Sequence, residues 1–284
     1  YGAFSLRYSP DGSLLAVGAG DSSVRLWEIK SGKWGEALPV VFYLANQPPM
    51  QGAVLSLSFS RDGRTLVASA GVMARAWDVA QRRIIASRNC LTGSSGLYMP
   101  TVVDPDGKRM VYSCNSVSQD GSVNHTLRIV DLVNKNEDIE QVLPVTLMTM
   151  AFGTGAQSDL LALGTTENMV VLWNPGTGQA VGEPLRAHHA EVTSVAFTPD
   201  GKQLVSSDWE HHVAVWALEP AGQVDRLSTR IKLPEEKTQF SDQVTNLAFD
   251  GQGETLFMSR VYGSKLYVGG AGSEQTVRVA AAAD

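Results

Sequence analysis

A short turn recurs along the chain and restricts what the chain can fold into. The turn ends in Asp-Gly, and a Pro or Arg precedes this pair. Pro presets φ, Asp bonds its own backbone and Gly accepts positive φ, so each copy predicts a tight turn between two strands. The clear copies are Ser9-Pro10-Asp11-Gly12, Ser60-Arg61-Asp62-Gly63, Asp104-Pro105-Asp106-Gly107 and Thr198-Pro199-Asp200-Gly201. Looser copies are Gly153-Thr154-Gly155 and Asp250-Gly251-Gln252-Gly253. Helical periodicity is not sustained anywhere, so we expect an almost entirely β protein.

A second signal is a short run of alternating apolar and polar residues, which recurs with the same spacing as the turn. The runs are Val24–Glu28, Ala74–Asp78, Leu127–Asp131, Val170–Asn174 and Val213–Ala217, and Trp27, Trp77, Trp173 and Trp216 occupy one equivalent place in them. Together the two signals predict six units of short antiparallel strands, at approximately 1–45, 46–92, 93–143, 144–186, 187–233 and 234–284. A period of roughly 40 to 50 residues with four strands per unit is typical of propellers, since one unit cannot bury both its faces alone.

One stretch, Arg186 to Leu218, holds a complete unit. It contains Ala187-His188, the strand Val192–Phe197, the turn, and two further strands, of which the last carries Trp216. This stretch resembles a WD40 repeat, and the resemblance extends over nearly the whole chain. It implies an all-β, single-domain propeller of four-stranded antiparallel blades, with six blades or an incomplete set of seven. It also implies a buried network of His188, Ser206, Glu210 in place of the usual Asp, and Trp216. In the other units this set is mostly lost.

Composition excludes several classes of protein. The net charge is −6 and Lys and Arg form no cluster of five or more, so a nucleic-acid partner is not indicated. The longest mainly apolar stretch, Val142 to Phe152, is too short to span a bilayer and is interpreted as a core strand. Cys90 and Cys114 lie in strand-like runs, which favours buried, unpaired residues in a reducing compartment. We therefore expect a cytoplasmic protein that does not bind membranes.

Histidines gather in the fifth unit, where four of the five lie. Topology should bring His188, His189, His211 and His212 to one face, near Asp208, Glu210 and Glu191, which would suit zinc or copper. Against this, His188 already has a network role and strand alternation separates His211 from His212. We expect no metal and no cofactor. No nucleophile, base and orienting residue can be assembled either, so no catalytic residue is assigned.

Two classes of function remain open. The resemblance implies a non-catalytic scaffold that binds a protein or peptide. The alternative is a propeller enzyme, such as a hydrolase or a quinone-dependent dehydrogenase, with its site at the channel mouth. Polar residues converging from several blades would favour the enzyme, but the first strands supply mainly apolar, Ser, Thr and Ala side chains. Both ends of the sequence suggest a piece of a longer protein, in which an effector such as an NTPase, kinase or protease could be attached.

Loop lengths point to the binding face. Loops that join the first two strands of a unit, or its last two, are short. Long loops fall at the other end, at Pro39–Ala53, Asn115–His125 and Arg230–Asp242, and long loops tend to carry function. The residues expected to bind the partner on this face are Trp209, His189, His211, Tyr98, Gln51 and Gln243.

Overall fold

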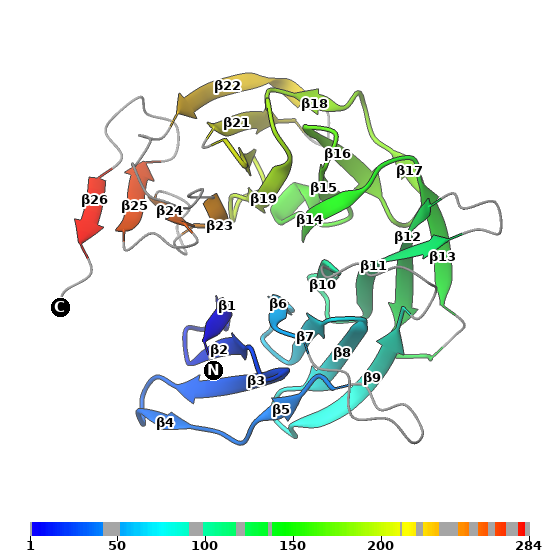
Figure 1. Ribbon diagram of the computed structural model, residues 1–284, viewed down its shortest axis with the longest axis vertical. Helices are drawn as coiled ribbons and strands as arrows, with labels where there is room; N and C mark the ends of the chain where they lie inside the picture. The colour runs from blue at the N-terminus through cyan, green and yellow to red at the C-terminus, as the bar shows by residue number, and fades with distance from the viewer. Residues whose placement is uncertain are drawn as a thin grey trace. The chain divides into compact units, whose positions relative to one another are not determined.

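A computed structural model describes most of the chain as antiparallel sheet. The described residues are 2–41, 52–90, 99–117, 123–135, 138–210, 212–219, 224–232, 244–249, 255–260, 265–270 and 278–281. They belong to two compact units, Tyr1–Pro144 and Val145–Asp284. Each unit contains three sheets whose successive strands pair in chain order (Figure 1). Among the described residues the one helical element is η1, a 3-10 turn at Gly155–Gln157, so the predicted all-β class is confirmed.

The first unit contains β1 to β13. Its first sheet comprises β1 (Ala3–Tyr8), β2 (Leu14–Ala19), β3 (Ser23–Glu28), β4 (Lys33–Trp34) and β5 (Leu38–Pro39). The second comprises β6 (Val54–Phe59), β7 (Thr65–Ala70), β8 (Met73–Asp78) and β9 (Arg83–Asn89). The third comprises β10 (Thr101–Val103), β11 (Arg109–Val117), β12 (Val123–Asp131) and β13 (Ile139–Leu143).

The second unit contains β14 to β26. Its first sheet comprises β14 (Leu147–Phe152), β15 (Leu161–Thr165), β16 (Met169–Asn174), β17 (Gln179–Ala180) and β18 (Leu185–Arg186). The second comprises β19 (Val192–Phe197), β20 (Gln203–Asp208), β21 (His212–Leu218) and β22 (Val224–Lys232). The third comprises β23 (Val244–Phe249), β24 (Thr255–Arg260), β25 (Lys265–Gly270) and β26 (Arg278–Ala281).

The recurring turn joins the first two strands of its sheet as predicted. In three copies the first residue is a hydroxyl that donates to the Asp two residues later and accepts the backbone N–H five residues later. The donor distances are 2.6 Å for Ser9, 2.6 Å for Ser60 and 2.7 Å for Thr198. The glycine that closes these three turns has φ of 70°, 70° and 74°, which a residue with a Cβ rarely adopts. Each turn is thus fixed by its own side chains and sets the register of its hairpin.

Neighbouring sheets pack through apolar faces and also through serine hydroxyls. Ser5 on β1 donates to the carbonyl of Val54 on β6 at 2.6 Å, and Ser56 on β6 donates to the carbonyl of Thr101 on β10 at 2.8 Å. In the second unit the N–H of Leu247 on β23 donates to Ser194 on β19 at 3.2 Å. The first strand of one sheet is therefore hydrogen-bonded to the first strand of the next.

The number and regularity of the blades correct the sequence-based prediction. The structure shows five blades, which are built from β1 to β22. Two of the five have a fifth strand, because the outer strand is split into two short pieces. The prediction of four-stranded blades in a six-bladed or incomplete seven-bladed propeller, with six repeat units visible, is therefore wrong. The strands β23–β26 form one further four-stranded sheet. The sequence-based prediction relied on the recurring turn and on the alternating run of the third strand. Both signals are weakest in the last predicted repeat, residues 234–284.

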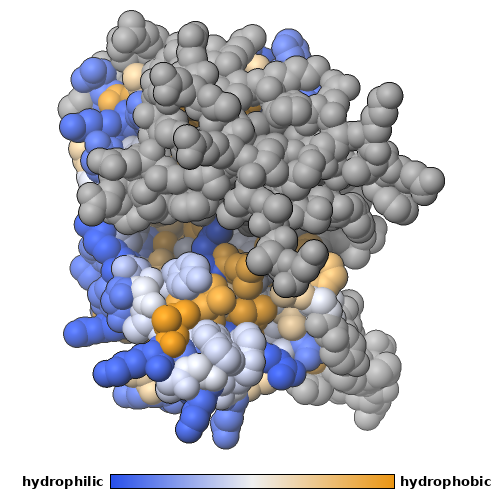
Figure 2. Space-filling model, turned by 90° about the vertical axis from the view of Figure 1, so that its left-hand side faces the viewer, coloured by the Kyte–Doolittle hydropathy of each residue, from blue (hydrophilic) through white to orange (hydrophobic). Residues whose placement is uncertain are grey.

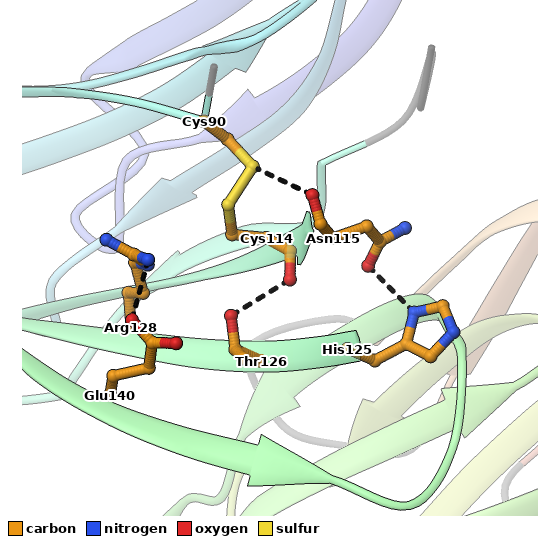
Figure 3. Close-up of a disulfide and its surroundings, with 7 residues drawn as sticks. All are labelled: Cys90, Cys114, Asn115, His125, Thr126, Arg128 and Glu140. Atoms are coloured by element: carbon orange, nitrogen blue, oxygen red, sulfur yellow. Dashed lines mark hydrogen bonds and ion pairs between the residues drawn. A yellow bond between two sulfur atoms is a disulfide. The ribbon is translucent and has the colours of Figure 1, made fainter. Parts of the chain in front are cut away.

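The two cysteines also correct the prediction. Cys90 follows β9 and Cys114 lies on β11, and the two form a disulfide with their Cα atoms 5.7 Å apart (Figure 3). Cys114 is buried in the core between the second and third sheets, as expected, but neither residue is a free thiol. The cysteines therefore give no argument for a reducing compartment.

The stretch Val142–Phe152 is not one core strand. It covers the end of β13 and all of β14, with Pro144 between them, and Val142 is exposed. Proline has no N–H to donate to a strand ladder, which explains the break. No helix among the described residues is long and apolar enough to cross a membrane.

Candidate functional site

A chain of four buried polar side chains crosses the β19–β22 sheet. Trp216 on β21 donates its Nε1–H to the Ser206 hydroxyl on β20 at 3.0 Å, and Ser206 lies 2.6 Å from Nε2 of His188. His188 Nδ1 lies 3.2 Å from Oδ2 of Asp208. With Ser206 donating to Nε2 and His188 donating from Nδ1, every member has a partner. The side chains of His188 and Asp208 are fully buried, so the network is closed to water.

Asp208, rather than Glu210, supplies the carboxylate of this network. Asp208 is the last residue of β20 and lies two residues after Ser206, so both side chains are on one face of the strand. Its Oδ1 accepts the N–H groups of Glu210 at 3.0 Å and His212 at 2.8 Å, which fixes the loop between β20 and β21. Glu210 is exposed, so its predicted place in the network is wrong.

Burial by itself would raise the pKa of Asp208, but the hydrogen bonds from His188 and from the backbone of His212 and His189 keep the pKa below its ordinary value. A carboxyl whose pKa is lowered on folding stabilises the native state above its unfolded pKa. This stabilisation is lost as the pH falls toward the folded pKa.

We therefore expect the difference in melting temperature between wild type and Asp208→Asn to shrink as the pH is lowered from 6 toward 3. Below about pH 4 the carboxyl of the unfolded wild-type chain begins to take up a proton, so the ionised Asp208 stabilises the folded state less, whereas the asparagine of the variant does not titrate. Scanning calorimetry across this range measures the effect. A difference that stays constant over the range would contradict the role given to the ionised carboxylate.

The order of hydrogen bonds in this network is that of a hydrolytic triad, with a serine, a histidine and an aspartate in series. A triad must expose its hydroxyl to a substrate. Ser206 is fully buried and its oxygen already accepts the indole N–H of Trp216. The arrangement therefore holds the blade together and has no access for a substrate.

Above the network, side chains reach the surface at the end of the sheet where the predicted binding face lies. The N–H of Trp209 donates to the carbonyl of Glu191 at 3.0 Å, which ties the loop after β20 to the loop before β19. The rings of His189 and His212 meet edge to face with centroids 5.2 Å apart. Trp209 is 38% exposed. The two loops thus share one end of the sheet, as the topology predicted.

The other predicted binding residues, His211, Tyr98, Gln51 and Gln243, lie outside the described residues. The long loops are also shorter than predicted where they can be seen. Asn115 and His125 are paired across β11 and β12, with their side chains 2.8 Å apart (Figure 3), and Arg230 to Lys232 belong to β22. Over the described part of the chain, no group of three or more His, Cys, Asp or Glu side chains is placed to hold a metal ion.

Comparisons with known proteins agree with this geometry. The family model described as "WD domain, G-beta repeat" matches residues 2–28 and 179–217, and the second match contains the network. The β-propeller domain of Cps50 (Swd1) from Myceliophteria thermophila superimposes with a TM-score of 0.76 at 17% identity, covering 98% of this chain and 85% of that one. The chain is similar to WD40-type β-propellers in sequence and in fold.

Relatives in sequence are WD-repeat proteins too. SEC12-like protein 2 of Arabidopsis thaliana is 28% identical over 77% of this chain and 52% of its own length. The guanine nucleotide-binding protein subunit beta-1 of Nicotiana tabacum is 24% identical over 75% of this chain and 56% of its own length. The chain thus spans about half the length of these relatives. Propellers of the WD40 type generally act as protein-interaction scaffolds and are typically not catalytic.

Proposed function

We propose that this propeller binds a protein or peptide through the end of its blades that carries the loop before the first strand and the loop between the second and third strands. The observation that carries the proposal is the exposed indole of Trp209, which lies in a loop fixed from below by the buried Asp208. An anchor held by its own loop loses little conformational freedom on binding. Tryptophan is also enriched among residues that dominate binding energy.

The surroundings of Trp209 support a role in recognition. His189 and His212 add two rings beside the loop, and Glu191 and Glu210 add exposed carboxylates. An apolar centre with polar groups around it is the usual composition of a protein interface. The proposed scaffold would dock one partner here, as part of a larger protein to which an effector domain could belong.

Trp209→Ala is expected to weaken partner binding by at least about 2 kcal/mol, or roughly thirtyfold, because the largest apolar contact is lost. The fold should be unchanged, since no network member is removed. Calorimetric titration of the partner measures the affinity, and circular dichroism checks the fold.

The control is Asp11→Ala in the turn between β1 and β2, at the end of its own sheet that carries the short loops. Its loss changes a turn and leaves the proposed surface untouched, so binding should match wild type. Equal binding by wild type and Trp209→Ala, or a loss confined to Asp11→Ala, would refute the assignment of this surface.

A further inference from the structure

The third sheet, β10–β13, continues at one end as a hairpin of two strands only. Residues 115–117 of β11 pair with residues 123–125 of β12, and this pair of strand ends is called the hairpin extension below. The ladder of β10 on β11 stops at Tyr112, and the ladder of β13 on β12 stops at His125. A two-stranded hairpin is only marginally stable in water. The extension therefore depends on the contacts at its base.

The Cys90–Cys114 disulfide lies at this base (Figure 3). Cys114 directly precedes residues 115–117, and its carbonyl accepts the hydroxyl of Thr126 on the facing strand at 2.9 Å. Cys90 is anchored in the second sheet, because its N–H donates to the carbonyl of Val72, between β7 and β8, at 2.9 Å. The disulfide thus fastens the extension of the third sheet to the end of the second sheet.

Cys114 occupies the position that Asp208 occupies in the β19–β22 sheet. Each residue stands ten residues after the first residue of its recurring turn, on the second strand of its sheet. Asp208 contacts His188, which lies between the preceding sheet and β19. Cys114 is bonded to Cys90, which lies between the preceding sheet and β10. The disulfide therefore makes the connection that a histidine and an aspartate make in the β19–β22 sheet.

The first two sheets have no such connection at the equivalent position. The residues there are Ala19 in the first sheet and Ala70 in the second, and both are buried. An alanine side chain can form neither a hydrogen bond nor a covalent link. Apolar side chains are gathered on the described part of the first unit, to which these sheets belong (Figure 2). Packing serves at this position in both sheets, so the covalent link is particular to the third sheet.

The surroundings of the disulfide also suit the reduced pair. Sγ of Cys90 lies 3.6 Å from the carbonyl oxygen of Asn115, so a thiol at Cys90 has an acceptor in reach. Cys114 is buried in the core between the second and third sheets, where a thiol behaves as a small apolar side chain. Reduction therefore removes the link without leaving either sulfur in an unsuitable environment.

We propose that the Cys90–Cys114 disulfide is a redox-sensitive clamp on the hairpin extension. In the oxidised chain the clamp holds the extension on the second sheet, and a dithiol reductant releases it. The apolar core and the ion pair of Arg88 with Asp138 keep both sheets folded in either state. The oxidation state of the clamp thus controls the order of this end of the third sheet. The proposal goes beyond the proposed function and does not require the Trp209 surface.

The release consists of two thiol–disulfide exchanges. A thiolate of the dithiol attacks Sγ of Cys90, the partly exposed half of the bond, and Cys114 leaves as a thiolate that takes up a proton. The second thiolate of the reductant then attacks the mixed disulfide, and Cys90 leaves and is protonated in turn. Two electrons and two protons pass to the protein, and the reductant is oxidised to a cyclic disulfide.

Hydrogen–deuterium exchange of the whole chain, followed by mass spectrometry, tests the clamp. Peptides that cover the hairpin extension should exchange at least about tenfold faster after reduction with dithiothreitol, because the extension then opens locally. Peptides from β7 and from residues 109–113 of β11 should exchange at an unchanged rate. Peptides from β20 and β21 should not respond either, since hydrogen bonds make the connection in that sheet.

The matched control is the double variant Cys90→Ser with Cys114→Ser. Its extension should exchange as fast as that of the reduced wild type, with and without dithiothreitol. The single variants test the route of attack with a chromogenic aromatic disulfide. Cys114→Ser leaves the partly exposed thiol of Cys90, which should react at least about tenfold faster than the buried thiol that Cys90→Ser leaves.

Four results would overturn the proposal. The disulfide could resist dithiothreitol until near-UV circular dichroism shows the chain unfolding. Reduction could be complete, with both thiols alkylated, and yet leave exchange in the extension unchanged. It could instead accelerate exchange equally over all three sheets of the first unit. Equal reactivity of the two single variants would exclude attack at Cys90. A loss of partner binding with Trp209→Ala bears on the proposed function alone, so the two proposals can fail separately.

Discussion

Replacing Asp208 by alanine is expected to lower the free energy of unfolding by about 3 to 5 kcal/mol, because each buried donor that loses its acceptor costs about 1 to 3 kcal/mol. The carboxylate is fully buried and receives the ring N–H of His188 and the backbone N–H groups of Glu210 and His212. The substitution would leave these donors without an acceptor in a low-dielectric interior. Equilibrium unfolding in urea, followed by circular dichroism, measures the loss.

Two matched controls show whether the network is assigned correctly. Glu210→Ala removes an exposed carboxylate two residues away and should change the free energy of unfolding by less than about 0.5 kcal/mol. His188→Ala should lower the melting temperature, whereas His189→Ala should not, since only His188 contacts Ser206. If Glu210→Ala lowered the free energy of unfolding more than Asp208→Ala, Glu210 rather than Asp208 would supply the carboxylate of the network.

The sequence carried enough information for most of the network. The resemblance to a WD40 repeat implied His188, Ser206 and Trp216. The carboxylate did not, because the repeat places an acid shortly before the third strand and two acids, Asp208 and Glu210, lie there. Strand alternation distinguishes them, since Ser206 and Asp208 are two residues apart on β20 and share a face. The alternation of side chains along β20 identifies Asp208 as the carboxylate of the network, whereas the family pattern led to Glu210.

In the fold, the turns were predictable because the residues that stabilise each turn lie within it. These residues are a hydroxyl or an Asp that forms hydrogen bonds inside the turn. The split outer strands were not, since β4 and β5 are pieces of two residues with no alternation to detect. The disulfide was not predictable either. Cys90 and Cys114 belong to different sheets, and only the packing of those sheets brings them together.

Loss of the disulfide is expected to lower the free energy of unfolding by about 3 kcal/mol. Without the disulfide, the unfolded chain is no longer closed into a loop between Cys90 and Cys114, so its conformational entropy rises. For a protein of this size, this corresponds to a fall in melting temperature of about 6 to 12 °C. Cys90→Ala with Cys114→Ala gives the loss by substitution, and dithiothreitol gives it in the wild type. Calorimetry with and without the reductant measures both.

The double variant should still fold, because the disulfide is not the only link between the second and third sheets. Arg88 on β9 forms a forked ion pair with Asp138, just before β13, at 2.6 and 2.8 Å, and the hydrogen bond keeps the pKa of Arg88 raised. Tyr112 and Met110 also stay packed against Val67 and Ala74 in the core between these sheets. Reductant should therefore bring wild type to the melting temperature of the double variant and leave the variant itself unchanged. Two reactive thiols per chain in the unreduced protein would contradict the cross-link. If reductant lowered both melting temperatures equally, its effect could not come from the disulfide, because a chain without cysteines has no disulfide to lose.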